Sequence, residues 1–130
     1  MILTGGRIES FGLYARTDLP EFRPGLVLVF GENESGKTTL LEFLRQTLFG
    51  YNAANQTPYY ETHNGERPGG ELAFLLSGGE RVTLSRTGAR GAANVFAGDG
   101  RALGQDAVER LTGGLSAEAY RTLFALTLDD

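Results

Sequence analysis

The chain has 130 residues, of which 41% are hydrophobic, 22% are charged and 19 are glycine. This length suits one domain, and the hydrophobic content excludes an intrinsically disordered chain. The formal net charge of −4 argues against a dedicated nucleic-acid module, and the absence of cysteine excludes disulfides and cysteine-based zinc sites.

The first predicted elements are extended. Residues 7–11 have strand character, and a second extended stretch runs from residue 13 towards Phe22, interrupted by Pro20 and Pro24 as in an edge strand followed by a turn. Leu26–Phe30 is a continuous apolar run, which is typical of a strand buried on both faces. It is far too short to span a bilayer, and the amino terminus does not resemble a signal peptide. We therefore expect a cytoplasmic protein without membrane contact.

Helical spacing of leucines predicts a helix over Thr38–Phe49, which Gly50 ends. Residues 51–69 form a polar loop without periodicity, and loops of this length in compact domains are usually functional or mobile. Two strands, Glu71–Leu76 and Arg81–Arg86, are predicted to follow as a hairpin.

The last third of the chain begins with a further predicted strand, Ala92–Phe96, which the turn Gly98–Gly100 closes. Two helices are expected after it, Asp106–Leu111 and, behind an N-cap at Ser116, Ala117–Leu123. The predicted fold is α/β, with a strand and helix around a phosphate-binding loop (P-loop) beside an antiparallel β-meander.

Residues 31–38 read Gly-Glu-Asn-Glu-Ser-Gly-Lys-Thr and fit the P-loop pattern G-x-x-x-x-G-K-S/T at every position. The glycines permit a tight loop whose amides form an anion nest, and the following helix directs its positive dipole end at the phosphates. Lys37, the only lysine, is predicted to bind the β- and γ-phosphates as the catalytic cation, and the Thr38 hydroxyl to bind Mg²⁺. The competing interpretation is a glycine-rich strand–helix turn with a surface lysine. The predicted nucleotide-binding residues are Gly31, Glu32, Asn33, Glu34, Ser35, Gly36, Lys37, Thr38 and Thr39.

The stretch Gly25–Leu44 around this motif resembles the amino-terminal segment of SMC- and SbcC-type ATPases, which carry ABC-type heads on long coiled coils. Leu48–Gly50 and Gly69–Leu72 make the bacterial YhaN-like AAA ATPases the most similar. The resemblance implies a P-loop NTPase fold and ATP and Mg²⁺ as cofactors. It implies a role for the complete protein in DNA repair or chromosome maintenance.

The same resemblance implies that residues 1–130 form a single domain, the amino-terminal lobe of such a head, within a longer coiled-coil protein. A carboxy-terminal lobe supplies the signature motif and the Walker B carboxylates, and two heads dimerise around ATP. Hydrolysis is expected only in that assembly, so the isolated chain is expected to be inactive. DNA is a partner of the full assembly. The family's Q-loop glutamine has no counterpart, because Gln46, Gln56 and Gln105 lie at other positions.

Two segments imitate motifs of the carboxy-terminal lobe. Leu76–Glu80 reads Leu-Ser-Gly-Gly-Glu, like an ABC signature, but the alternation after it favours a hairpin turn in which the glycines adopt positive φ. Leu126–Asp130 imitates a Walker B strand, although a helix end running into acidic residues explains it better.

Two other functions remain open for the chain as a whole, a self-contained P-loop kinase or NTPase and a nucleotide-gated docking module.

Four other side chains are lesser candidates. His63 is a single histidine in a polar loop, so we expect a solvated residue and no metal site. Arg16 either approaches the nucleotide or forms a surface ion pair. Tyr59 and Tyr60 either stack on a base or pack within the loop.

Overall fold

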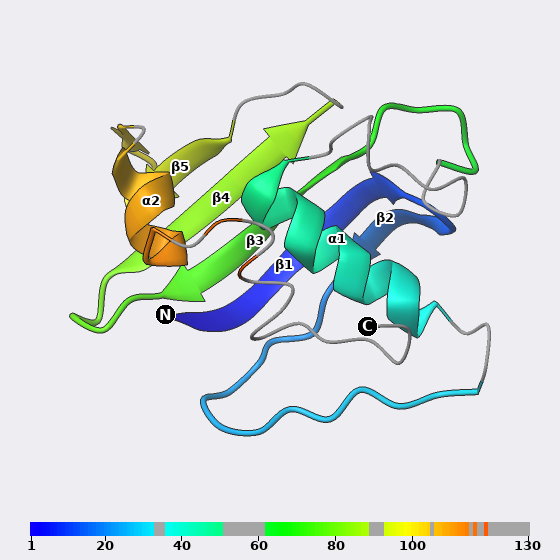
Figure 1. Ribbon diagram of the computed structural model, residues 1–130, viewed down its shortest axis with the longest axis horizontal. Helices are drawn as coiled ribbons and strands as arrows, with labels where there is room; N and C mark the ends of the chain where they lie inside the picture. The colour runs from blue at the N-terminus through cyan, green and yellow to red at the C-terminus, as the bar shows by residue number, and fades with distance from the viewer. Residues whose placement is uncertain are drawn as a thin grey trace.

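The computed structural model describes residues 1–32, 36–50, 62–88, 93–104 and 106–114, together with Ser116 and Ala119. These residues form one six-stranded antiparallel sheet in the order β2-β1-β3-β4-β5-β6, with helices α1 and α2 on the same face (Figure 1). The strands are β1 (Ile2–Phe11), β2 (Tyr14–Asp18), β3 (Gly69–Leu75), β4 (Arg81–Thr87), β5 (Asn94–Ala97) and β6 (Ala102–Leu103). The helices are α1 (Lys37–Phe49) and α2 (Asp106–Thr112). Neither is long and apolar enough to cross a bilayer.

The core lies between the helices and one face of the sheet. Leu72 and Phe74 of β3 are opposite Leu84 and Val82 of β4, and all four side chains are buried. Their neighbours along both strands are exposed or half-buried, as expected where one face of an antiparallel sheet meets water. The alternation that predicted this hairpin therefore also selects the face on which the helices pack.

Helix α1 approaches the sheet closely because a glycine leaves room for an aromatic ring. Phe43 is fully buried and packs edge-to-face on Phe11, with ring centroids 5.6 Å apart and an interplanar angle of 61°. A Cβ at Gly70 would lie 2.6 Å from Phe43 Cζ and 2.5 Å from the carbonyl oxygen of Arg7. The absence of a side chain at Gly70 thus allows α1 to pack this close to the sheet.

The carboxyl end of α1 is held by a side chain from the sheet. Arg86 of β4 is buried, its Nε donates to the Thr47 carbonyl at 3.0 Å, and its Nη2 donates to the Leu48 carbonyl at 3.3 Å. Carbonyls in the last helical turn have no partner within the helix, and the negative end of the helix dipole favours a cation there. Gly50 follows with φ of 118°, which confirms the predicted end of the helix.

The predicted hairpin at residues 76–80 is confirmed, so this segment is no ABC signature on a helix. Leu76 donates to the Glu80 carbonyl at 2.8 Å and accepts from the Gly79 amide at 2.9 Å. The expectation that both glycines have positive φ is wrong, because only Gly79 does, at 84°. A type I turn followed by one left-handed residue requires positive φ at its last position only.

Gly79→Val is therefore expected to lower the free energy of unfolding by about 2 kcal/mol, since a β-branched residue is strained in the left-handed region. Gly78→Val is the matched control. A Cβ at Gly78 meets nothing within 4 Å, so its effect should stay within about 0.5 kcal/mol. Urea unfolding of both variants measures the difference. Equal losses in both, or a larger loss for Gly78→Val, would contradict this assignment of the turn.

The prediction of a buried strand at Leu26–Phe30 is wrong for the described structure. The segment belongs to none of the six strands and runs outside the sheet (Figure 1). The chain first follows β1, where Leu19 and Phe22 donate to the carbonyls of Gly6 and Thr4, and leaves it after Pro24. A strand buried on both faces needs neighbouring strands and two covering layers, and the described residues supply neither.

The remaining predictions agree with the structure wherever it describes the residues concerned. β2 is an edge strand as expected, β1 begins five residues earlier than predicted, and β6 is an additional short strand. The predicted N-cap at Ser116 is supported because its Oγ accepts from the Ala119 amide at 3.1 Å. Residues 51–61, with Tyr59 and Tyr60, the body of the helix at 117–123, and Leu126–Asp130 lie outside the described residues.

Candidate nucleotide-binding site

The predicted P-loop connects the exposed segment Leu26–Phe30 to α1. Gly31 and Glu32 are exposed, Asn33, Glu34 and Ser35 lie outside the described residues, and Gly36 caps α1. Gly36 is buried with φ of 96°, a backbone conformation that side-chain-bearing residues rarely adopt. The second glycine of the motif is therefore required by its backbone as well as by the pattern.

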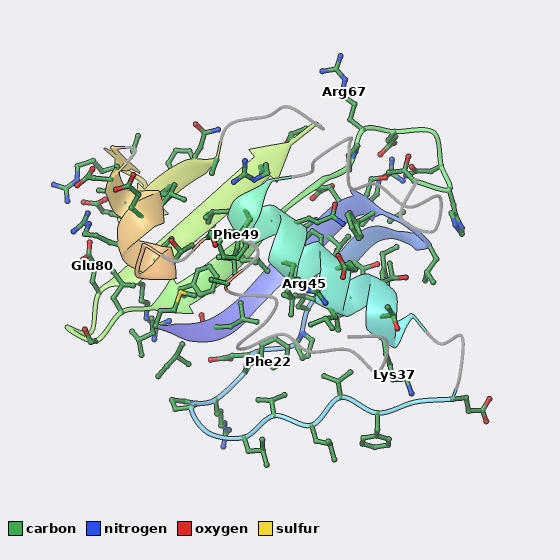
Figure 2. All side chains as sticks on the ribbon, in the orientation of Figure 1. Phe22, Lys37, Arg45, Phe49, Arg67 and Glu80 are labelled. Carbon is green, nitrogen blue, oxygen red and sulfur yellow. The ribbon has the colours of Figure 1, made fainter. Side chains whose placement is uncertain are left out.

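Lys37 is the first residue of α1 and lies at the helix's amino-terminal end (Figure 2). Its Nζ donates to the Gly31 carbonyl at 2.6 Å, so the lysine spans the loop and brings the two ends of the motif together. Among the residues that the structure describes, no side chain caps this end of α1, and its first turn contains no acidic residue. A lysine here opposes the helix dipole, and a bound anion would relieve the repulsion while accepting from the free amides.

Thr38 and Thr39 continue the first turn of α1. The Thr38 side chain is exposed and the Thr39 side chain is half-buried. A threonine hydroxyl beside the phosphate-binding lysine is a hard oxygen ligand of the kind that Mg²⁺ accepts. The donor type at Thr38 therefore fits the predicted metal ligand.

A tyrosine from the β1–β2 hairpin also reaches the loop, and no pattern in the sequence predicts this contact. Tyr14 Oη donates to the Gly36 carbonyl at 3.2 Å. Gly12, with φ of 55°, turns the chain from β1 into β2 and so places Tyr14 at the first position of β2. The turn was visible in the sequence, but nothing local relates position 14 to position 36.

Arg16 and His63, two of the lesser candidates, make contacts outside the P-loop. Arg16 forms a surface ion pair with Glu66, Nη2 to Oε1 at 3.1 Å, with both side chains at least half exposed. His63 is exposed, and its backbone amide donates to the Gly12 carbonyl at 3.0 Å. Among the described residues, no three histidine or carboxylate side chains are grouped as a metal site.

Comparison with known protein families identifies the type of domain that carries this site. A family model described as an AAA domain matches residues 1–130. The chain belongs to the AAA domain family. The family implies a P-loop NTPase fold and a nucleotide-binding ATPase domain, which agrees with the α/β architecture. No curated protein matches the chain.

Proposed function

We propose that the AAA domain binds Mg-ATP through Gly31–Thr39, with Lys37 on the β- and γ-phosphates and Thr38 on the metal. The observation that carries this proposal is the position of the chain's only lysine, at the first residue of α1 with its Nζ 2.6 Å from the Gly31 carbonyl. The helix dipole disfavours a cation at that position. Anion binding explains why the lysine is there.

We further propose that the domain is half of an SMC- or SbcC-like head that acts in DNA repair or chromosome maintenance. The exposed apolar segment Leu26–Phe30 supports the existence of a partner that covers it. Alternate residues Leu26, Leu28 and Phe30 are 99%, 77% and 85% exposed, whereas Val27 and Val29 are 47% and 52% exposed. An exposed apolar segment of this kind is typical of an interaction site. A strand from a carboxy-terminal lobe would pair with it to form a parallel sheet. Hydrolysis then requires that lobe and a second head.

Nucleotide titration tests the binding proposal directly. Lys37→Ala should weaken Mg-ATP binding at least about tenfold, because the main charge-assisted contacts to the phosphates are lost. The variant should melt at an unchanged or slightly higher temperature, since a cation is removed from the positive end of α1. Fluorescent-nucleotide binding and thermal melting measure the two effects.

Arg81→Ala is the matched control, because it removes an exposed positive charge from β4 rather than from α1. It should leave Mg-ATP affinity unchanged. Equal affinity of wild type and a folded Lys37→Ala variant would contradict the phosphate-binding assignment. Equal losses in both variants would reduce the role of Lys37 to general charge attraction.

A further inference from the structure

Tyr14 makes two contacts with the end of the P-loop. Its hydroxyl donates to the Gly36 carbonyl at 3.2 Å, and the same carbonyl accepts the first hydrogen bond of α1 from the Leu40 amide at 2.9 Å. The ring also lies against the glycine, because a Cβ at Gly36 would be 2.5 Å from Tyr14 Oη and 3.0 Å from Cζ. The tyrosine thus fixes both the place and the orientation of this carbonyl.

Orienting that carbonyl also orients a phosphate donor. The peptide unit is planar and trans, so the Gly36 carbonyl and the Lys37 amide point in opposite directions within one plane. Lys37 is the first residue of α1, and its amide is one of the four helical N–H groups without a partner in the helix. A hydroxyl that holds the carbonyl therefore aims the Lys37 amide outward from the helix end, where anions bind.

The hairpin that carries Tyr14 is itself held from a third part of the chain. The Gly12 carbonyl accepts from the His63 amide at 3.0 Å, and Ser10 Oγ donates to Asn64 Oδ1 at 2.8 Å. Ser10 is fully buried beside this contact. Tyr14 thus lies on a strand whose position is fixed by these hydrogen bonds. A residue that positions another group needs such a rigid support.

We propose that Tyr14 is a positioning residue of the nucleotide site, which sets the direction of the Lys37 amide for a phosphate oxygen. The inference rests on the proposed function and adds a residue outside the P-loop pattern to it. Tyr14 acts through the backbone of Gly36, so its effect should be confined to the phosphate groups of the ligand and independent of the base.

Tyr14→Phe tests this role, because it removes the hydroxyl and keeps the ring that packs on Gly36. Thr17→Val is the matched control, because it removes a hydroxyl from the same strand that bonds locally, to the Ala15 carbonyl at 3.1 Å. Dissociation constants for Mg-ADP and for tripolyphosphate, measured by NMR titration of wild type and both variants, are the primary measurement. The second is the backbone ¹⁵N–¹H signal of Lys37 without ligand.

Tyr14→Phe should weaken Mg-ADP and tripolyphosphate binding by the same factor, about fivefold, as expected for one neutral hydrogen bond. It should also shift the Lys37 amide signal, and Thr17→Val should do neither. Unchanged affinities in Tyr14→Phe, or a loss for Mg-ADP alone, would overturn the inference while the proposed function stands. A wild-type chain that binds neither probe would overturn the proposed function and, with it, the role of Tyr14.

Discussion

Gly70→Ala is expected to lower the free energy of unfolding by about 3 kcal/mol, at the upper end of what overpacking costs. The new methyl group would lie 2.6 Å from Phe43 Cζ and 2.5 Å from the Arg7 carbonyl oxygen. The second of these atoms belongs to the backbone of β1, which pairs with β3 along the whole strand. Either α1 moves away from the sheet or β1 and β3 separate. Chemical denaturation followed by circular dichroism measures the loss.

Gly5→Ala is the matched control, because the added Cβ lies in the same sheet but only 3.7 Å from its nearest neighbour, the Pro20 carbonyl oxygen. It should cost less than about 1 kcal/mol. In a Phe43→Leu background, Gly70→Ala should lose about half of its effect, since the ring atoms nearest the new methyl group are gone. A cost for Gly70→Ala that matches Gly5→Ala, or that ignores Phe43→Leu, would show that the close approach of α1 does not limit packing.

If the chain is half of a two-lobed head, as proposed, Leu28→Asp should abolish the ATPase activity of the complete protein, with a loss of at least about a hundredfold. The same substitution should leave the stability of the isolated chain unchanged. Leu28 is 77% exposed in the described structure, so the carboxylate is solvated there and costs little. In an assembled parallel sheet the same carboxylate would be buried without a partner, which costs several kcal/mol. ATPase rate and co-purification of the two lobes measure the effect.

Asn94→Asp is the control for charge, because it adds one negative charge at an exposed position of β5 with almost no change in shape. It should leave both readouts unchanged. Wild-type ATPase activity in Leu28→Asp would contradict the proposal that the exposed segment enters a shared sheet. A destabilised isolated chain would show that the segment already packs on its own domain.

Local patterns predicted most of the described fold. Helical spacing placed α1 to within one residue, and alternating burial placed β3 and β4, because each pattern repeats with the period of the element that it reports. Leu26–Phe30 failed for a different reason. A continuous apolar run predicts that a segment is buried, but it does not predict which residues, or which chain, bury it.

The features that sequence reasoning missed depend on contacts between distant residues. Arg86 caps a helix that ends 37 residues earlier, at Phe49, and Tyr14 reaches Gly36 across 22 residues. Neither pairing has a local period. The φ of Gly78 was predicted wrongly because the turn type, and not the presence of two glycines, decides which of them is left-handed. For the P-loop, by contrast, the pattern itself predicts the residues, and the structure adds the contact between Lys37 and Gly31.

The exposed run Leu26–Phe30 also has a consequence for how the protein is made and stored. Five consecutive apolar residues of high β-propensity, without charge or proline, are the kind of segment from which intermolecular β-sheets nucleate. An unpaired extended segment offers its amides and carbonyls to any similar segment, including the same segment of a second molecule. The proposed partner strand and self-assembly would therefore compete for one surface, and the rate of self-association rises as the square of protein concentration. A partner that covers Leu26–Phe30 would therefore also protect the protein from aggregation through this segment.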